Sequence, residues 1–97
     1  MKYFFYIIRS QVTEEFYLGQ TSNLEDRMIR HNNKRSNYTK RGTPWILVYY
    51  ETFLSRKDAI NRERFLKSPQ GWKTLQEIKQ NLPPNVAQPV PKGSLRD

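Results

Sequence analysis

The stretch YLGQTSNLEDRMIRH, residues 17–31, decides the fold of this chain and the position of its candidate site. It holds the end of an expected strand, a turn, and an expected helix at about residues 23–33. On a helical wheel, Arg27 and His31 fall within about 60° of Leu24, so both share the apolar face. Burying them costs several kcal/mol unless they find partners, which a polar pocket or a bound phosphate would supply. The alternatives are an arginine that extends to solvent and a hydrogen-bonded core histidine.

The length and composition limit what the chain can be. Its 97 residues suit one small domain, expected at residues 1–81. Residues 82–97 hold four of the six prolines and are expected to form a proline-rich flexible tail. The absence of cysteine and the single histidine exclude disulfides, thiolate zinc sites, cysteine nucleophiles and histidine-based zinc sites. A metal would therefore be a hard cation held by oxygen.

The apolar N-terminal run is short. It reaches from Tyr3 to Ile8 and is followed by Arg9, so it is too short for a membrane span or a signal-peptide core. We therefore expect no membrane association and a cytoplasmic location.

Positive charge is concentrated in the middle of the sequence. The chain carries 17 Lys and Arg against 9 Asp and Glu, a formal net charge of +8. No acidic residue occurs between Asp26 and Glu51. Cations interleaved with small polar donors are typical of contacts to a phosphate backbone, and predict salt-sensitive nucleic-acid binding. The predicted nucleic-acid-binding residues are Arg30, Lys34, Arg35, Lys40 and Arg41.

Three segments have strand character. Residues 2–9 are apolar without a breaker, which suits a strand covered on both faces. A short connection predicts an antiparallel hairpin with a second strand that ends at Gln20, and residues 45–53 predict a third strand. Gly19 is explained by close backbone approach, by a positive φ, or simply by a turn.

Two further helices are expected after the third strand. A capping-box pattern in Ser22 to Glu25 marks the start of the first helix, and a second such pattern, Ser55 to Asp58, opens a helix that runs to about Lys67. Ser68-Pro69 is expected to cap and open the third helix. Glu63 falls on the apolar face of the middle helix, and the alternative is a surface ion pair with Arg62, Arg64 or Lys67.

These motifs, in this order and spacing, closely resemble those of the GIY-YIG nuclease family. Phe4-Phe5-Tyr6 corresponds to the first family tripeptide and Tyr17-Leu18-Gly19 to the second, followed by Arg27 and His31. The segment AINRERFLK, residues 59–67, resembles the family's glutamate-bearing helix. The chain is most similar to small stand-alone bacterial members, and also to the nuclease domains of excision-repair endonucleases and of homing endonucleases.

The resemblance covers about residues 2–80, with identifiable departures. The first tripeptide lacks the family's glycine and isoleucine. Gln20 stands where some members carry lysine, and no asparagine follows Glu63 until Asn81. The resemblance implies an α+β sandwich in which a three-stranded antiparallel sheet is flanked by three helices.

The resemblance also implies metal-dependent phosphodiester hydrolysis with named roles. Tyr17 would activate the attacking nucleophile, directly or through water, and Tyr6 would be the neighbouring phenol. Arg27 would neutralise charge on the scissile phosphate, and His31 would assist proton transfer or phosphate positioning. Glu63 would hold one Mg²⁺ or Mn²⁺, because a single carboxylate in the constellation favours one metal ion over two.

The expected function is thus a metal-dependent DNA endonuclease or nickase, with repair or recombination structures as candidate substrates. DNA is favoured over RNA as the partner, and a protein partner is left open. The alternative is a nucleic-acid-binding module that keeps the fold but has negligible catalysis. A third hypothesis is a protein-interaction adaptor that uses the proline-rich tail.

Overall fold

The computed structural model describes residues 1–33, 38–82 and 88–89, and its centre is a three-stranded antiparallel sheet. The central strand β1 (Tyr3–Ser10) pairs with β2 (Phe16–Thr21) on one side and with β3 (Trp45–Phe53) on the other. The order β2-β1-β3 confirms the predicted hairpin and places the third strand at an edge of the sheet.

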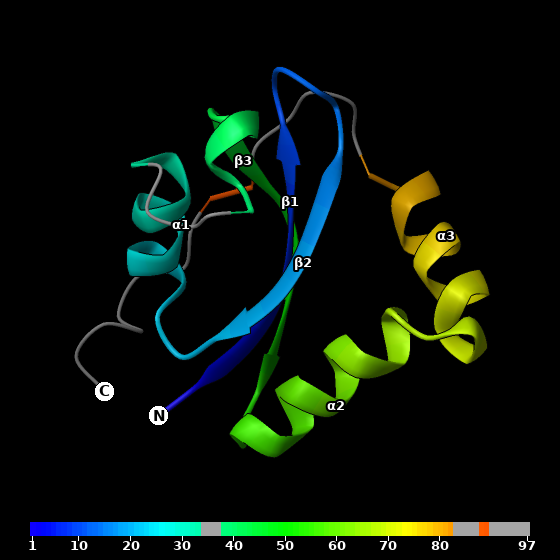
Figure 1. Cartoon of the computed structure of the whole chain (residues 1–97). Coiled ribbons are helices and arrows are strands. Elements are labelled where there is room, and N and C mark those ends of the chain that lie inside the picture. The colour runs from blue at the N-terminus through cyan, green and yellow to red at the C-terminus, as the bar shows by residue number, and fades with distance from the viewer. Residues whose placement is uncertain (34–37, 83–87, 90–97) are drawn as a thin grey trace.

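The apolar run of β1 is explained by burial on both faces. Phe4, Tyr6 and Ile8 face a cluster that includes side chains of α1 (Leu24–Asn32). Phe5 and Ile7 face the opposite cluster, which takes Leu66 from α2 (Arg56–Leu66) and Leu75 from α3 (Trp72–Gln80). Figure 1 shows the resulting layers, with α1 on one side of the sheet and α3 on the other. Three helices flanking one sheet confirm the expected α+β sandwich.

The start of α1 differs from the expected capping box. Asn23, not Ser22, is the N-cap residue, and its side-chain oxygen accepts a hydrogen bond from the Asp26 amide at 2.9 Å. The Asn23 amide in turn donates to the Thr21 hydroxyl at 3.1 Å. A short polar side chain one residue later therefore satisfies the first turn, because asparagine caps helices as well as serine does.

The second helix begins as predicted, but the third does not. The Ser55 hydroxyl caps α2 by accepting from the Asp58 amide at 3.1 Å. Pro69 instead opens a short 3₁₀ turn, η2 (Pro69–Gly71), and α3 starts only at Trp72. The Ser68 hydroxyl donates to the Phe65 carbonyl at 2.6 Å, so it serves the end of α2 rather than the start of α3. A side chain at Gly71 would collide with that same carbonyl, which explains the glycine here.

Within the described part of the chain, no helix combines the length and the apolar character needed to cross a bilayer. Lys34 and Arg35, and the predicted tail apart from Leu82, Gln88 and Pro89, lie outside the described residues.

Candidate active site

The sheet register brings the two predicted tyrosines onto one face. Tyr6 of β1 pairs with Gly19 of β2, and Ile8 pairs with Tyr17. Side chains two residues apart on a strand point to the same face, so Tyr6 and Tyr17 are diagonal neighbours on the face that α1 covers. Tyr6 is fully buried, whereas Tyr17 is partly exposed.

His31, in the last turn of α1, joins the buried tyrosine. Its side chain is 1% exposed, and its Nε2 atom lies 2.9 Å from the Tyr6 hydroxyl oxygen. Its Nδ1 atom lies 2.8 Å from the hydroxyl of Thr39, which is also buried. A neutral imidazole donates through one nitrogen and accepts through the other, so both hydrogen bonds can form together. The Tyr17 ring packs edge-on against the imidazole, with ring centroids 5.2 Å apart.

Burial determines the protonation of this pair. Burial, together with the nearby positive charge of Arg27, lowers the pKa of His31 to about 4. Burial also raises the pKa of Tyr6 above its ordinary value, although the charge of Arg27 and a hydrogen bond from it act in the opposite direction. At neutral pH, His31 is therefore an uncharged imidazole and Tyr6 a protonated phenol.

Gly19 has a specific steric role opposite Tyr6. A Cβ atom at this position would lie 2.5 Å from the Tyr6 hydroxyl oxygen and 2.7 Å from the adjacent ring carbon. Gly19 lies inside β2, not in a turn, and its backbone is not in the left-handed region. Gly19 is therefore explained by the close approach of the Tyr6 side chain to its backbone, and not by a turn or a positive φ.

Two charged side chains from different helices complete the group. Arg27 is partly buried on α1, and Glu63 of α2 has a side chain that is 21% exposed. The charges of both act on the Tyr6 hydroxyl, as does the neighbouring Tyr17. Tyr6, Tyr17 and His31 therefore lie together on the face that α1 covers, and the Arg27 and Glu63 side chains approach the Tyr6 hydroxyl from α1 and α2.

Glu63 also forms the ion pair that was its alternative explanation. Its Oε2 atom lies 2.6 Å from the Lys67 ammonium, which in turn lies 5.8 Å from the centre of the Tyr17 ring. The ion pair that was the alternative for Glu63 is thus observed, and its Lys67 partner lies close to the Tyr17 ring. Among the described residues, no group of three or more His, Cys, Asp or Glu side chains could hold a metal ion.

Two members of this region were not anticipated. Thr39 orients the imidazole through its hydroxyl, and its carbonyl accepts from the Trp45 indole nitrogen at 2.6 Å. The sequence indicated Lys67 only as a surface partner of Glu63, and the structure places its ammonium 5.8 Å from the centre of the Tyr17 ring. The spacing of four residues on a helix indicated the Lys67 pair, whereas no local pattern indicates that Thr39 meets His31.

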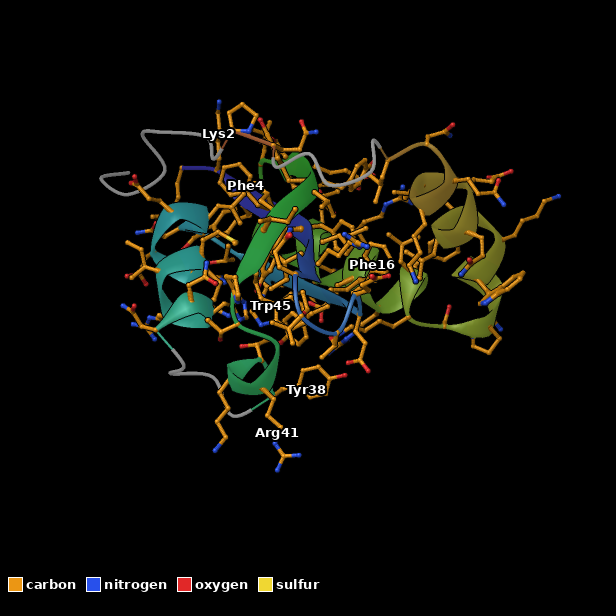
Figure 2. The ribbon with its side chains drawn as sticks, turned by 90° about the horizontal axis from the view of Figure 1, so that it is seen from above. Lys2, Phe4, Phe16, Tyr38, Arg41 and Trp45 are labelled. Carbon is orange, nitrogen blue, oxygen red and sulfur yellow. The ribbon has the colours of Figure 1, made fainter. Side chains whose placement is uncertain are left out.

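The predicted nucleic-acid-binding residues are only partly within the described chain. Arg30 is exposed on α1 and pairs with Asp26 at 3.0 Å. Lys40 and Arg41 are exposed in the 3₁₀ turn η1 (Lys40–Gly42), and Figure 2 shows Arg41 projecting from that end of the molecule together with Tyr38.

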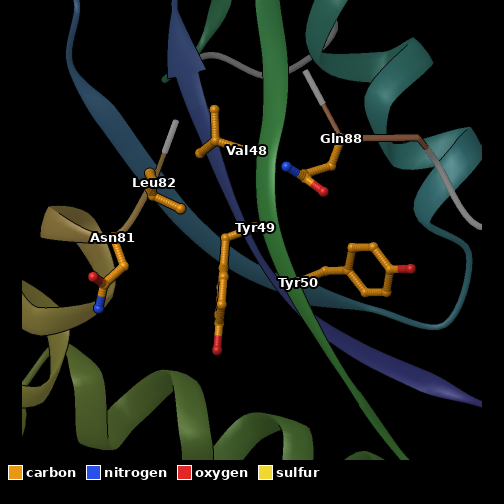
Figure 3. Close-up of a pocket in the computed structure, with 6 residues that line it drawn as sticks. All are labelled: Val48, Tyr49, Tyr50, Asn81, Leu82 and Gln88. Carbon is orange, nitrogen blue, oxygen red and sulfur yellow. The ribbon is translucent and has the colours of Figure 1, made fainter. Parts of the chain in front are cut away.

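A separate hollow lies beside the edge strand β3. It has a volume of about 430 Å³, and Gln88 reaches it from the C-terminal part of the chain by donating its backbone amide to the Leu47 carbonyl at 2.7 Å. Tyr49 and Tyr50 point to opposite sides of this strand (Figure 3). Its lining residues are Val48, Tyr49, Tyr50, Asn81, Leu82 and Gln88, so the five predicted catalytic residues do not line it.

The fold and this grouping of side chains define a small nuclease-type domain. Residues 2–76 match the model of the GIY-YIG catalytic domain, and the chain belongs to the GIY-YIG family.

Curated relatives and a solved structure agree with this assignment. The UPF0213 protein SH2523 of Staphylococcus haemolyticus is 38% identical over 68 residues, which cover 69% of this chain and 82% of the relative. The UPF0213 protein CPE1444 of Clostridium perfringens is 40% identical over 63 residues, covering 64% and 67% respectively. The solution NMR structure of the UPF0213 protein BH0048 from Bacillus halodurans is similar with a TM-score of 0.52 and 25% identity, over 87% of this chain and 89% of that one.

Proposed function

We propose that this chain is a metal-dependent endonuclease that hydrolyses phosphodiester bonds in DNA. The observation that supports the proposal best is the grouping around the Tyr6 hydroxyl. His31 hydrogen-bonds to that hydroxyl, and the charges of Arg27 and Glu63 both act on it. A cation and an anion beside a buried phenol do not stabilise an apolar core. Titratable groups with shifted pKa values are instead typical of functional sites.

The exposure of the side chains suggests their roles. Tyr17, being partly exposed, is the phenol that substrate and water reach, and we assign to it the activation of the nucleophile. The buried His31 imidazole packs against the Tyr17 ring and holds the Tyr6 hydroxyl in place through their hydrogen bond. Arg27 supplies a planar set of donors for the oxygens of the scissile phosphate.

Glu63 suits a single hard divalent cation. Carboxylate oxygen is a preferred ligand of Mg²⁺ and Mn²⁺, and Mg²⁺ usually keeps several waters alongside one or two carboxylates and substrate phosphates. When bound, such an ion would stabilise charge on the phosphoryl group and the leaving oxygen. One available carboxylate supports one ion rather than two.

Positive charge near this face supports nucleic acid as the substrate. Arg30, Lys40 and Arg41 are exposed on α1 and η1, and the whole chain carries a net charge of +8. Backbone contacts of this kind carry little sequence information, so recognition would depend on substrate structure. Recognition of substrate structure fits a role in DNA repair or recombination. We propose a cytoplasmic location for this activity.

The test is cleavage of a labelled panel with Mg²⁺, Mn²⁺ or EDTA. The panel contains duplex, flap, splayed and four-way DNA, together with RNA of the same sequences. The proteins are the wild type, Tyr17→Phe and Glu63→Gln. Tyr3→Phe and Glu77→Gln are matched controls, because they remove a phenol and a carboxylate outside the group described above.

We expect metal-dependent products that disappear with Tyr17→Phe and Glu63→Gln and persist with both controls. Binding without products under every metal condition would contradict the endonuclease and leave the nucleic-acid-binding module. Preferential cleavage of RNA would overturn the assignment of DNA.

A further inference from the structure

An exposed aromatic ring lies directly beside the candidate site. Tyr38 is 67% exposed, and its ring centroid lies 5.3 Å from that of Tyr17 with an interplanar angle of 37°. Tyr17 in turn packs against His31. A row of rings therefore runs from the buried imidazole to the surface, and Tyr38 is its outermost member.

The backbone next to Tyr38 is held in place by hydrogen bonds. Thr39 is fully buried, its carbonyl accepts from the Trp45 indole nitrogen at 2.6 Å, and its hydroxyl meets His31. Three residues further on, the Gly42 carbonyl accepts from the Ser10 hydroxyl at 2.7 Å. An exposed aromatic side chain on such an anchored segment is already positioned, so binding to it would cost little ordering entropy.

A hollow of about 440 Å³ opens next to this ring. This volume falls within the roughly 300–1,000 Å³ of small-molecule sites. Tyr38 and Trp45 contribute aromatic residues to its lining, and Thr13, Glu15 and Arg41 contribute polar and charged ones. The lining residues are Thr13, Glu15, Tyr38, Arg41, Gly42 and Trp45.

The chemistry of this lining selects a base rather than a phosphate. The Glu15 carboxylate repels a phosphate but accepts hydrogen bonds from exocyclic amino groups, and Arg41 donates to carbonyl and ring-nitrogen acceptors. Aromatic faces stack on any nucleobase.

We propose that this hollow binds one unpaired nucleobase, stacked on Tyr38, while the adjoining phosphate enters the site at Tyr17. This inference rests on the proposed function and names the substrate class: a strand with an unpaired nucleotide beside the scissile bond. In a continuous duplex each base is already stacked between its neighbours and cannot occupy the hollow without leaving the helix.

Binding in EDTA tests the proposal without any cleavage. The probes are a fluorescein-labelled 12-nucleotide single strand and a duplex of the same sequence. A second copy of the strand carries 2-aminopurine, whose fluorescence falls when it stacks. The proteins are the wild type, Tyr38→Ala and Tyr38→Phe. Trp72→Ala is the matched control, because Trp72 is 62% exposed and begins α3.

We expect Tyr38→Ala to weaken binding of the single strand by about 5- to 150-fold, which is the range for losing one base stacked on an aromatic ring. The quenching of 2-aminopurine should disappear, and binding of the duplex should change less than about twofold. Tyr38→Phe should restore both signals, since the ring and not the hydroxyl provides the stacking.

Equal weakening of single strand and duplex, an unchanged single-strand affinity, or failure of Tyr38→Phe to restore quenching would each overturn the proposal. Circular dichroism confirms that the variants are folded. Because no step in this experiment requires catalysis, a protein that cleaves nothing can still show the base site. Conversely, a protein that does cleave DNA can fail this test, so the base site and the nuclease activity are tested separately.

Discussion

The Lys67 ammonium lies 2.6 Å from the Glu63 carboxylate. The carboxylate that we propose as the ligand of the divalent metal is therefore already paired with a lysine. The two residues are one helical turn apart at the end of α2, where Lys67 is the C-cap residue, and both side chains are partly exposed. A metal ion that binds Glu63 must therefore compete with Lys67, which would then be left beside the Tyr17 ring at the site.

Removing this competition should strengthen metal binding. We predict that Lys67→Gln binds Mn²⁺ more tightly than the wild type, by up to about fivefold, because a surface ion pair contributes at most about 1 kcal/mol. Isothermal titration calorimetry with Mn²⁺ measures the effect. Lys73→Gln, an exposed lysine of α3, is the matched control and should leave the affinity unchanged. Weaker Mn²⁺ binding by Lys67→Gln would show that Lys67 supports the metal instead of competing with it.

The contact between Gly19 and Tyr6 gives a prediction on stability. Gly19→Ala should lower the free energy of unfolding by about 1–3 kcal/mol, because the added Cβ overpacks a fully buried ring. Urea denaturation followed by circular dichroism measures the loss. The Tyr6→Phe background should recover part of it, since the hydroxyl oxygen is the atom closest to the added Cβ. Strict additivity of the two substitutions would contradict this steric explanation.

His31 makes the stability of the fold depend on pH. The pKa of His31 is about 4 in the folded protein against an ordinary value of 6.5, so between these pH values the unfolded chain binds more protons. The contribution is complete above pH 6.5 and is lost as the pH falls toward 4, by up to about 3 kcal/mol.

Urea unfolding of the wild type and of His31→Gln isolates the contribution of His31. The measurements run from about pH 7.5 to about pH 4.5, a range that includes the ordinary histidine pKa of about 6.5. Titrating carboxylates affect both proteins and cancel in the difference. We expect the difference in unfolding free energy between the two proteins to shrink as the pH falls. A difference that stays constant with pH would show that His31 does not titrate over this range.

The sheet could be predicted because its signals are local. The strand over residues 45–53 has the predicted boundaries, since its β-branched and aromatic residues are continuous and Pro44 marks its start. The inward position of His31 also follows from helical periodicity alone, and the structure shows it buried.

Other parts depend on contacts that no local pattern contains. Asn32 fixes the end of α1 to β3, because its side-chain oxygen accepts from the Trp45 amide at 2.6 Å and its amide nitrogen donates to the Trp45 carbonyl at 3.1 Å. The start of α3 was wrong for a similar reason: Pro69 suits the first turn of either helix type, and close packing of Gly71 on the end of α2 selects the 3₁₀ turn. Three-dimensional packing also placed Thr39 and Tyr38 at the site.

The basic residues of η1 allow a prediction on salt dependence. Lys40→Gln combined with Arg41→Gln should weaken DNA binding and reduce the slope of log K against log salt. Each phosphate contact contributes about 0.9 to this slope for duplex DNA and about 0.7 for a single strand. The loss should therefore be about 1 where Arg41 contacts the base and only Lys40 contacts a phosphate, and should approach about 2 where both contact phosphates. Fluorescence anisotropy in EDTA between roughly 50 and 200 mM salt gives the slope.

The matched control is Lys73→Gln combined with Lys79→Gln, which removes the same charge from α3. If both pairs flatten the slope equally, only net charge matters and η1 is not the path of the nucleic acid. If neither changes it, the phosphates lie elsewhere on the surface. A reduced slope for the η1 pair alone would place the backbone along the segment that also carries Tyr38, because Lys40 and Arg41 follow that ring within three residues.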